Sequence, residues 1–144
     1  MAIVKKLKQH PPLPPSRYEV GIYCRVSTAS KTQVVSAGHQ MSGLIADVAN
    51  SQQVRLYDVY LDIQSGRTSD NRKNLMRLLD DCKAGRVTLV YTKSISRFAR
   101  NTVDVLTIVR ELKKMNVPVY FENEQLYSFD KEAELAISLH GAIA

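Results

Sequence analysis

Residues 18–27, which read YEVGIYCRVS, alternate with a period of two. A period of two is typical of an extended strand, because successive side chains point to opposite faces. One face of this strand is wholly apolar, whereas the other ends in Arg25 and Ser27. Burying a guanidinium without an anionic partner is costly. The pattern therefore predicts a strand that packs into a core with one face and presents Arg25 to an anion with the other.

In later segments the apolar residues have the spacing that is typical of helices. Apolar residues at i, i+3, i+4 and i+7 predict a helix that begins near Ser36, with this serine as its N-cap, and a second helix that closes at Gly85. A third helix is expected from about Asn101, where Asn101 and Asp104 have the spacing of a capping pair. The apolar residues of these helices are Met41, Leu44, Ile45 and Val48, then Leu75, Leu78, Leu79 and Cys82, then Val105, Leu106, Val109 and Leu112.

Apolar and β-branched runs predict three more strands, over residues 54–61, 87–92 and 117–122. The run at 87–92 is apolar on both faces, as expected of a central parallel strand. Strands and helices thus alternate along the chain. This order predicts an α/β fold with an open, mostly parallel sheet flanked by helices.

The last segment, residues 130–144, is apolar around most of a helix circumference. Its pattern stops without a cap or a breaker. We expect a long helix that is truncated here, with an exposed face that meets another chain. A terminal helix that is fully buried in the domain is the alternative.

Composition suggests a domain boundary and a class of partner. Residues 1–17 combine four basic residues with Pro-Pro-Leu-Pro-Pro, so we expect a flexible, basic, proline-rich arm before a domain of residues 18–144. The net charge of +6 suits a polyanion such as nucleic acid but also fits many merely basic proteins. No apolar run approaches the ~18 residues of a membrane span, and we expect a cytoplasmic protein. The cysteines, Cys24 and Cys82, and the histidines lack metal-ligand spacing, so no metal is expected.

Arginines gather in the loops that follow the first three predicted strands. Ligands of parallel sheets bind beyond the carboxyl ends of the strands, where the strand order reverses. Arginine keeps its charge and offers a planar fork of donors that matches phosphate oxygens. The pattern predicts a phosphate site, for a nucleotide or a nucleic-acid backbone. Its residues are Arg25 and Ser27 after the first strand, Arg72 after the second, and Arg97 and Arg100 after the third, with Lys93 nearby.

Two details of these loops can be tested by a structure. Arg97 and Arg100 are three residues apart, so they share a face if their segment is helical, with Phe98 turned inward. Asp58 and Asp62 share one face of the second strand, and two carboxylates at this spacing are usually solvated. We place Asp62 at the start of the loop after that strand.

Several other classes of site do not fit the sequence. The loop after the first strand lacks both G-x-G-x-x-G and G-x-x-x-x-G-K-[ST], which disfavours a dinucleotide fold and a P-loop. No cluster of carboxylates suggests a two-metal nuclease. A small-molecule phosphate binder could use Thr28, Ser30 and Thr32, but the absence of glycine there counts against it. What remains is a serine nucleophile surrounded by arginines.

Four stretches carry a family resemblance: YCRVST, the later Gln40, DIQSGRTSDNRKNL and KSISRFARN. Together, from about Tyr18 to the end, they resemble the catalytic domain of serine site-specific recombinases, which include resolvases, invertases and integrases of transposons and phages. The resemblance implies that Ser27 is the nucleophile and that Arg25, Arg97 and Arg100 bind the scissile phosphate. It also implies supporting roles for Arg72, Asp62 and Gln40. Tyr23 belongs to the motif, with either a supporting or a merely packing side chain.

The same resemblance implies a mechanism and an assembly. Attack by Ser27 on DNA gives a 5′-phosphoserine link and a free 3′-hydroxyl, and rejoining needs neither ATP, metal nor another cofactor. Strand exchange requires homodimers on each DNA site and a tetramer at synapsis, assembled through the final helix. A C-terminal region that reads the DNA sequence is expected outside these residues.

One departure from the family pattern opens an alternative. Many members have aspartate immediately before the first arginine of the third-loop motif, whereas this chain has Ser96. The serine is similar to that of the larger recombinases of mobile elements, which favours an active enzyme. The longer stretch between Ser27 and Gln40 points the same way. The alternative is a non-catalytic DNA-binding or regulatory module with the same fold.

Overall fold

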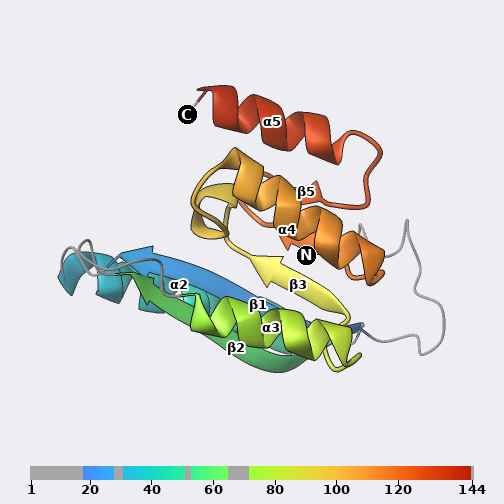
Figure 1. Ribbon diagram of the computed structural model, residues 1–144. Coiled ribbons are helices and arrows are strands. Elements are labelled where there is room, and N and C mark those ends of the chain that lie inside the picture. Colours follow the sequence, from blue (N-terminus) through green and yellow to red (C-terminus); the bar gives the residue numbers. More distant parts are fainter. Residues whose placement is uncertain (1–17, 28–30, 51–52, 65–71, 144) are drawn as a thin grey trace.

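The computed structural model describes residues 18–27, 31–50, 53–64 and 72–143 (Figure 1). The predicted arm, residues 1–17, and the loop residues Thr28 and Ser30 lie outside this described part. In chain order the elements are β1 Tyr18–Ser27, α2 Lys31–Ala49, β2 Val54–Gln64, α3 Lys73–Lys83, β3 Leu89–Thr92, the 3₁₀ turn η1 Ile95–Arg97, α4 Thr102–Lys114, β4 Val119–Phe121, β5 Leu126–Tyr127 and α5 Ala133–Ile143.

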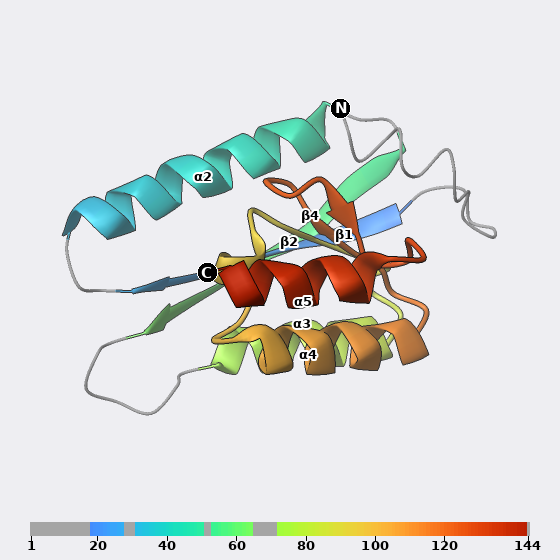
Figure 2. The same ribbon diagram turned by 90° about the horizontal axis from the view of Figure 1, so that it is seen from above.

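The strands form a five-stranded sheet in the order β2-β1-β3-β4-β5. β1 pairs in parallel with both β2 and β3, and β5 alone runs antiparallel, against β4. Helix α2 covers one face of the sheet, whereas α3 and α4 cover the other (Figure 2). The mostly parallel α/β sheet predicted from the sequence is confirmed. Because β2 and β3 lie on opposite sides of β1, the strand order reverses at β1, which is where such sheets bind ligands.

The two faces of β1 pack into two separate cores. Val20, Ile22, Cys24 and Val26 are buried against α2, whereas Tyr23 is buried with α3 and α4. The period of two thus sorts the side chains as predicted. Gly21 lies under α3, where an added Cβ would approach Leu78 Cδ1 to 2.8 Å. Helix α3 can therefore lie this close to β1 only because residue 21 has no side chain.

Several boundaries differ from the predicted ones. Helix α2 begins at Lys31 and not near Ser36, because no breaker stands between them and a serine is tolerated inside a helix. Strand β2 continues to Gln64, because its pairing with β1 extends to the Ser27–Gln64 pair. Asp62 consequently belongs to the strand and not to the following loop. Strand β5 was not predicted, since two residues carry no periodic signal.

Side chains of α3 cover the outer edge of β2. Arg77 Nη2 donates to the carbonyl of Val59 at 3.2 Å, and Asn74 Nδ2 donates to the carbonyl of Leu61 at 2.7 Å. The Arg77 guanidinium also bonds Asp58 at 2.7 Å and lies 4.1 Å from the centre of the Tyr60 ring. Open edge strands attract other strands, and these contacts occupy two of the carbonyls that would do so.

Helix α5 lies beside α4, at the far end of the sheet from β2 (Figure 1). An added Cβ on Gly141 would stand 1.7 Å from Thr102 Oγ1, so the two helices approach closely there. Ile137 is buried, but the side chains of Leu135 and Leu139 are 58% and 54% exposed. A helix that is fully buried in the domain is therefore wrong for this chain. Among the described residues, no helix combines the length and apolarity needed to cross a membrane.

Candidate active site

The carboxyl end of β1 brings the first two candidate residues to the point where the strand order reverses. Arg25 pairs with Asp62 of β2, and Ser27, the last residue of β1, pairs with Gln64. Arg25 Nη2 donates to the carbonyl of Ala99 at 3.3 Å. This guanidinium therefore spans from β1 to the segment after β3, as a site shared by these loops requires. The side chains of Ser27 and Gln40 lie outside the described residues, although their backbones belong to β1 and α2.

Asp62 is a buried anchor and not a solvated carboxylate, which corrects the expectation from its spacing with Asp58. Its carboxylate accepts from Tyr23 Oη at 2.8 Å and from the backbone N–H groups of Asn74 and Leu75 at 2.8 and 2.9 Å. The first turn of α3 leaves N–H groups without partners inside the helix. Asp62 satisfies two of them while it holds Tyr23, so it fixes α3 against β1.

Tyr23 packs in the core and donates a hydrogen bond to Asp62. Its ring meets Phe98 edge to face, with centroids 5.9 Å apart and planes at 86°. Burial, followed by the hydrogen bond to Asp62 and the charge of that carboxylate, raises the pKa of Tyr23. The phenol is thus held neutral as a donor. It is not suited to act as a general base at neutral pH.

The segment after β3 turns through a short 3₁₀ turn, η1. Ser94 caps it, because its Oγ accepts from the backbone N–H of Arg97 at 3.2 Å. Ser96 Oγ lies 3.1 Å from Ser94 Oγ, and Glu124 Oε1 accepts from the N–H of Ile95 at 3.0 Å. The sequence analysis gave no role to Ser94, although it lies in KSISRFARN, or to Glu124, which lies outside the motifs.

The geometry of Arg97 and Arg100 differs from a shared helical face. The turn ends at Arg97, so no continuous helix joins the two arginines. Phe98 is fully buried between Tyr23 and Phe121, which confirms its inward orientation. Burial raises the pKa of the Cys24 thiol, and the positive charge of the nearby Arg97 partly opposes this rise.

A single carboxylate links Arg72 to Arg100. Asp104 Oδ2 accepts from Arg72 Nη2 at 2.7 Å and from the backbone N–H of Arg100 at 3.3 Å. The same oxygen lies 3.7 Å from Arg100 Nε. Sequence reasoning assigned Asp104 only to a capping pair, and half of that pair is confirmed because Asn101 Oδ1 accepts from the Asp104 N–H at 2.9 Å. Its spacing of four from Arg100 is the one signal that could have indicated the ion pair.

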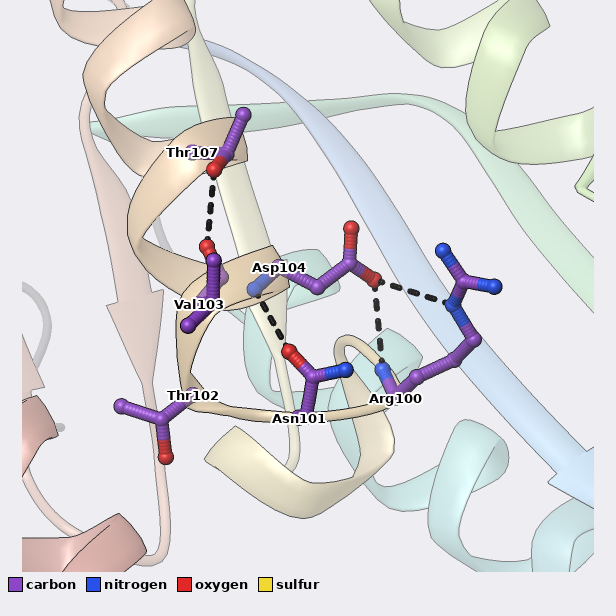
Figure 3. A pocket seen from close by; sticks show the side chains of 6 residues that line it. All are labelled: Arg100, Asn101, Thr102, Val103, Asp104 and Thr107. Atoms are coloured by element: carbon purple, nitrogen blue, oxygen red, sulfur yellow. Dashed lines mark hydrogen bonds and ion pairs between the residues drawn. The ribbon is translucent and has the colours of Figure 1, made fainter.

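The start of α4 also borders an open pocket of about 480 Å³ (Figure 3). Arg100 and Asp104 line it together with the first residues of the helix. Among residues 18–27, 31–50, 53–64 and 72–143, no three His, Cys, Asp or Glu side chains are gathered as a metal site would need. In the described part of the site, Asp104 is the carboxylate that contacts arginines, namely Arg72 and Arg100.

Comparison with known proteins decides the family. A family model described as "Resolvase, N terminal domain" matches residues 20–144. The chain belongs to the resolvase family. This confirms the resemblance on which YCRVST, DIQSGRTSDNRKNL and KSISRFARN were interpreted.

Two curated relatives of this resolvase-family chain are recombinases by name. A putative DNA recombinase of Bacillus subtilis (strain 168) is 29% identical over 126 residues, which cover 87% of this chain and 24% of the relative. The R46 site-specific recombinase of Escherichia coli is 27% identical over 122 residues, which cover 85% of this chain and 58% of the relative. The chain thus spans about a quarter of the length of the Bacillus subtilis protein and somewhat over half of that of the Escherichia coli protein.

Solved structures agree with the family. A resolvase family site-specific recombinase from Streptococcus pneumoniae superposes with a TM-score of 0.72 at 26% identity, covering 88% of this chain and 87% of that one. The N-terminal catalytic domain of TP901-1 integrase superposes with a TM-score of 0.62 at 19% identity, covering 87% and 93%. The second likeness concerns the fold alone.

Proposed function

We propose that this chain cleaves and rejoins DNA as the catalytic part of a serine site-specific recombinase. The observation that carries the proposal is the position of Ser27 at the end of β1, where the strand order reverses. Arg25 reaches from this strand to Ala99, between Arg97 and Arg100. Membership of the resolvase family and the recombinase names of its relatives support the same reaction.

In the proposed reaction, Ser27 Oγ attacks a phosphorus atom of the DNA backbone. A P–O bond to Oγ forms and the bond to the 3′-oxygen breaks, so that the serine proton is lost and the 3′-oxygen gains one. The products are a 5′-phosphoserine and a free 3′-hydroxyl. The ester keeps the energy of the phosphodiester, and attack by a new 3′-hydroxyl reverses the step without ATP.

Arginines supply the stabilisation that the weak serine nucleophile needs. Arg25, Arg97 and Arg100 would bind the phosphate and its developing negative charge, and loss of one such donor typically costs about 10²–10³ in rate. Arg72 and Gln40 would support them. Asp62 and Tyr23 would act by fixing α3 and β1, because their hydrogen bonds are directed to each other and to the α3 backbone.

Assembly would bring two cleaved duplexes together. We propose homodimers on each DNA site and a tetramer at synapsis, because cutting both strands of two duplexes requires four serine nucleophiles. Helix α5 supports this assembly, since Leu135 and Leu139 leave an apolar stripe on its outer side. A second copy would bury these leucines.

The test is a covalent adduct. The full-length protein is incubated with a verified cognate site that carries a nick, and a denaturation-resistant protein–DNA complex is expected. Ser27→Ala abolishes it, and Arg25→Ala lowers its formation at least ~10²-fold while the protein stays folded. An adduct that persists in Ser27→Ala removes Ser27 from the role.

Ser96 gives the non-catalytic alternative its specific observation. Ser96 is exposed and its hydroxyl contacts Ser94, at a position where the family pattern often supplies a carboxylate next to Arg97. A binding or regulatory module would bind the same site without cleaving it. Absence of an adduct from the wild-type protein on a verified site would favour this function.

A further inference from the structure

We propose that Asp104 is a positioning residue that holds Arg72 and Arg100 in register for the phosphate. The inference rests on the proposed function and adds to it a carboxylate that lies outside the loop motifs. Asp104 is in the first turn of α4, whereas its partners come from the start of α3 and from the segment after β3. One side chain therefore ties together two arginine-bearing segments that are far apart in the sequence.

Asp104 is well placed to be rigid. Its own N–H is capped by Asn101 at 2.9 Å, and only 13% of its side chain is exposed. Its Oδ2 lies 2.7 Å from Arg72 Nη2 and within 3.7 Å of Arg100 Nε. A charge-assisted hydrogen bond of 2.7 Å, such as that between Asp104 and Arg72, is among the stronger hydrogen bonds in proteins.

Electrostatics explains why a carboxylate is needed between these arginines. Two guanidinium groups repel each other, and in a half-buried setting water screens this repulsion less than at a fully exposed surface. Asp104 compensates one of the two charges before DNA arrives. The arginines are thus held near each other in the free protein, which lowers the ordering that phosphate binding would otherwise require.

Asp104 contacts only one side of each guanidinium. Asp104 engages one Nη of Arg72 and the Nε side of Arg100, and a guanidinium has five N–H donors. Figure 3 shows the two Nη nitrogens of Arg100 pointing away from the Asp104 carboxylate. The Arg100 side chain is 49% exposed. The contact with Asp104 therefore does not itself use the Nη groups with which Arg100 would bind phosphate.

The test measures the rate of adduct formation at saturating DNA, together with DNA affinity. Asp104→Asn is expected to lower the rate about 10–100-fold, as for a misplacement of catalytic groups by about 1 Å. Its dissociation constant for DNA stays within about threefold of the wild type. Asp104→Glu keeps the charge and recovers most of the rate.

Glu111→Gln is the matched control. It removes one negative charge from the same helix, and Glu111 contacts Lys114 at 3.9 Å and no arginine of the site. Its rate should equal that of the wild type. A double-mutant cycle adds the decisive comparison, because Asp104→Asn should cost much less in an Arg72→Ala background if it acts through Arg72.

Each result has a defined meaning. A wild-type rate in Asp104→Asn, or full additivity with Arg72→Ala, overturns the positioning role and leaves the proposed function standing. If Asp104→Asn does not fold, as judged by thermal melting, Asp104→Glu decides: a loss of more than about 100-fold in this folded variant contradicts the inference. Absence of an adduct from the wild-type protein contradicts the proposed function itself.

Discussion

At the scale of residues, one carboxylate organises the inner part of the site. Asp62 accepts three hydrogen bonds, from Tyr23 and from two backbone N–H groups of α3. Hydrogen bonds to a buried charged group are each worth about 1.5–3 kcal/mol, and a group left without its partner costs free energy as well. The side chain is therefore more important for stability than its place in a recombinase motif alone would indicate.

Asp62→Asn is expected to lower the free energy of unfolding by roughly 2–4 kcal/mol, because an amide cannot accept all three bonds. Asp58→Asn is the control on the same strand, where the lost partner is the exposed Arg77, and it should cost less than about 1 kcal/mol. Urea denaturation of both variants gives the comparison. Equal losses would show that Asp62 is not an anchor.

The raised pKa of Tyr23 predicts that the stability of the fold decreases at alkaline pH. Its pKa is raised in the folded protein, chiefly by burial and then by Asp62, so folding favours the protonated phenol. This stability is fully present below the ordinary tyrosine pKa of about 10 and is lost as the pH rises above it. Tyr60 and Tyr91 are shifted in the same direction, so Tyr23→Phe should remove part of the loss. Urea midpoints near neutral pH and above pH ~10 measure it, and an unchanged alkaline loss in Tyr23→Phe would contradict this account.

The sequence and the structure agree on residues where periodicity applies. Alternation along β1 correctly placed Tyr23 and Cys24 on opposite faces, and Phe98 is buried as expected. Asp104 could be predicted only as a cap, because its bond to Arg72 joins positions 32 residues apart. Such a contact depends on where α3 and α4 lie in the fold, which local spacing does not encode.

At the scale of elements, two glycines allow helices to lie close to their neighbours. Helix α3 contacts β1 over Gly21, and α5 contacts the start of α4 through Gly141. The periodic patterns predicted that these helices exist. They did not predict the start of α2, the end of β2 or strand β5, because those limits depend on pairing and packing partners.

Gly141→Ala should destabilise the protein by about 1–3 kcal/mol, because the new Cβ would overlap Thr102 unless α5 moved. In an ordinary helix position the same change stabilises by roughly 0.5–1 kcal/mol. Gly43→Ala on α2 is therefore the control, since nothing lies within 4 Å of its added Cβ. Thermal melting should move in opposite directions for the two variants, and a stabilised Gly141→Ala would contradict the close packing of α5.

At the scale of the whole molecule, the net charge bears on what this chain can bind. A net charge of +6 favours a polyanionic partner, for which DNA is the proposed one. The chain spans only part of each curated recombinase that it matches. Affinity for phosphates is therefore expected here without strong selectivity for a site.

The 144-residue chain should bind duplex DNA weakly and non-specifically, with an affinity that falls steeply as salt rises. Fluorescence anisotropy with two unrelated duplexes, each titrated at several salt concentrations, measures both properties. The two duplexes should give the same curve. Nanomolar binding to one of them alone would contradict this prediction.

The covered edge of β2 bears on what happens when copies of the protein crowd together. An open strand edge recruits a neighbouring strand, and several copies gathered on one DNA would raise their local concentration. Arg77 and Asn74 occupy two carbonyls on this edge. Because these carbonyls are occupied, crowded copies would be less able to pair edge to edge into extended sheets or fibres. In the proposed assembly, this resistance would let the complex come apart again after strand exchange.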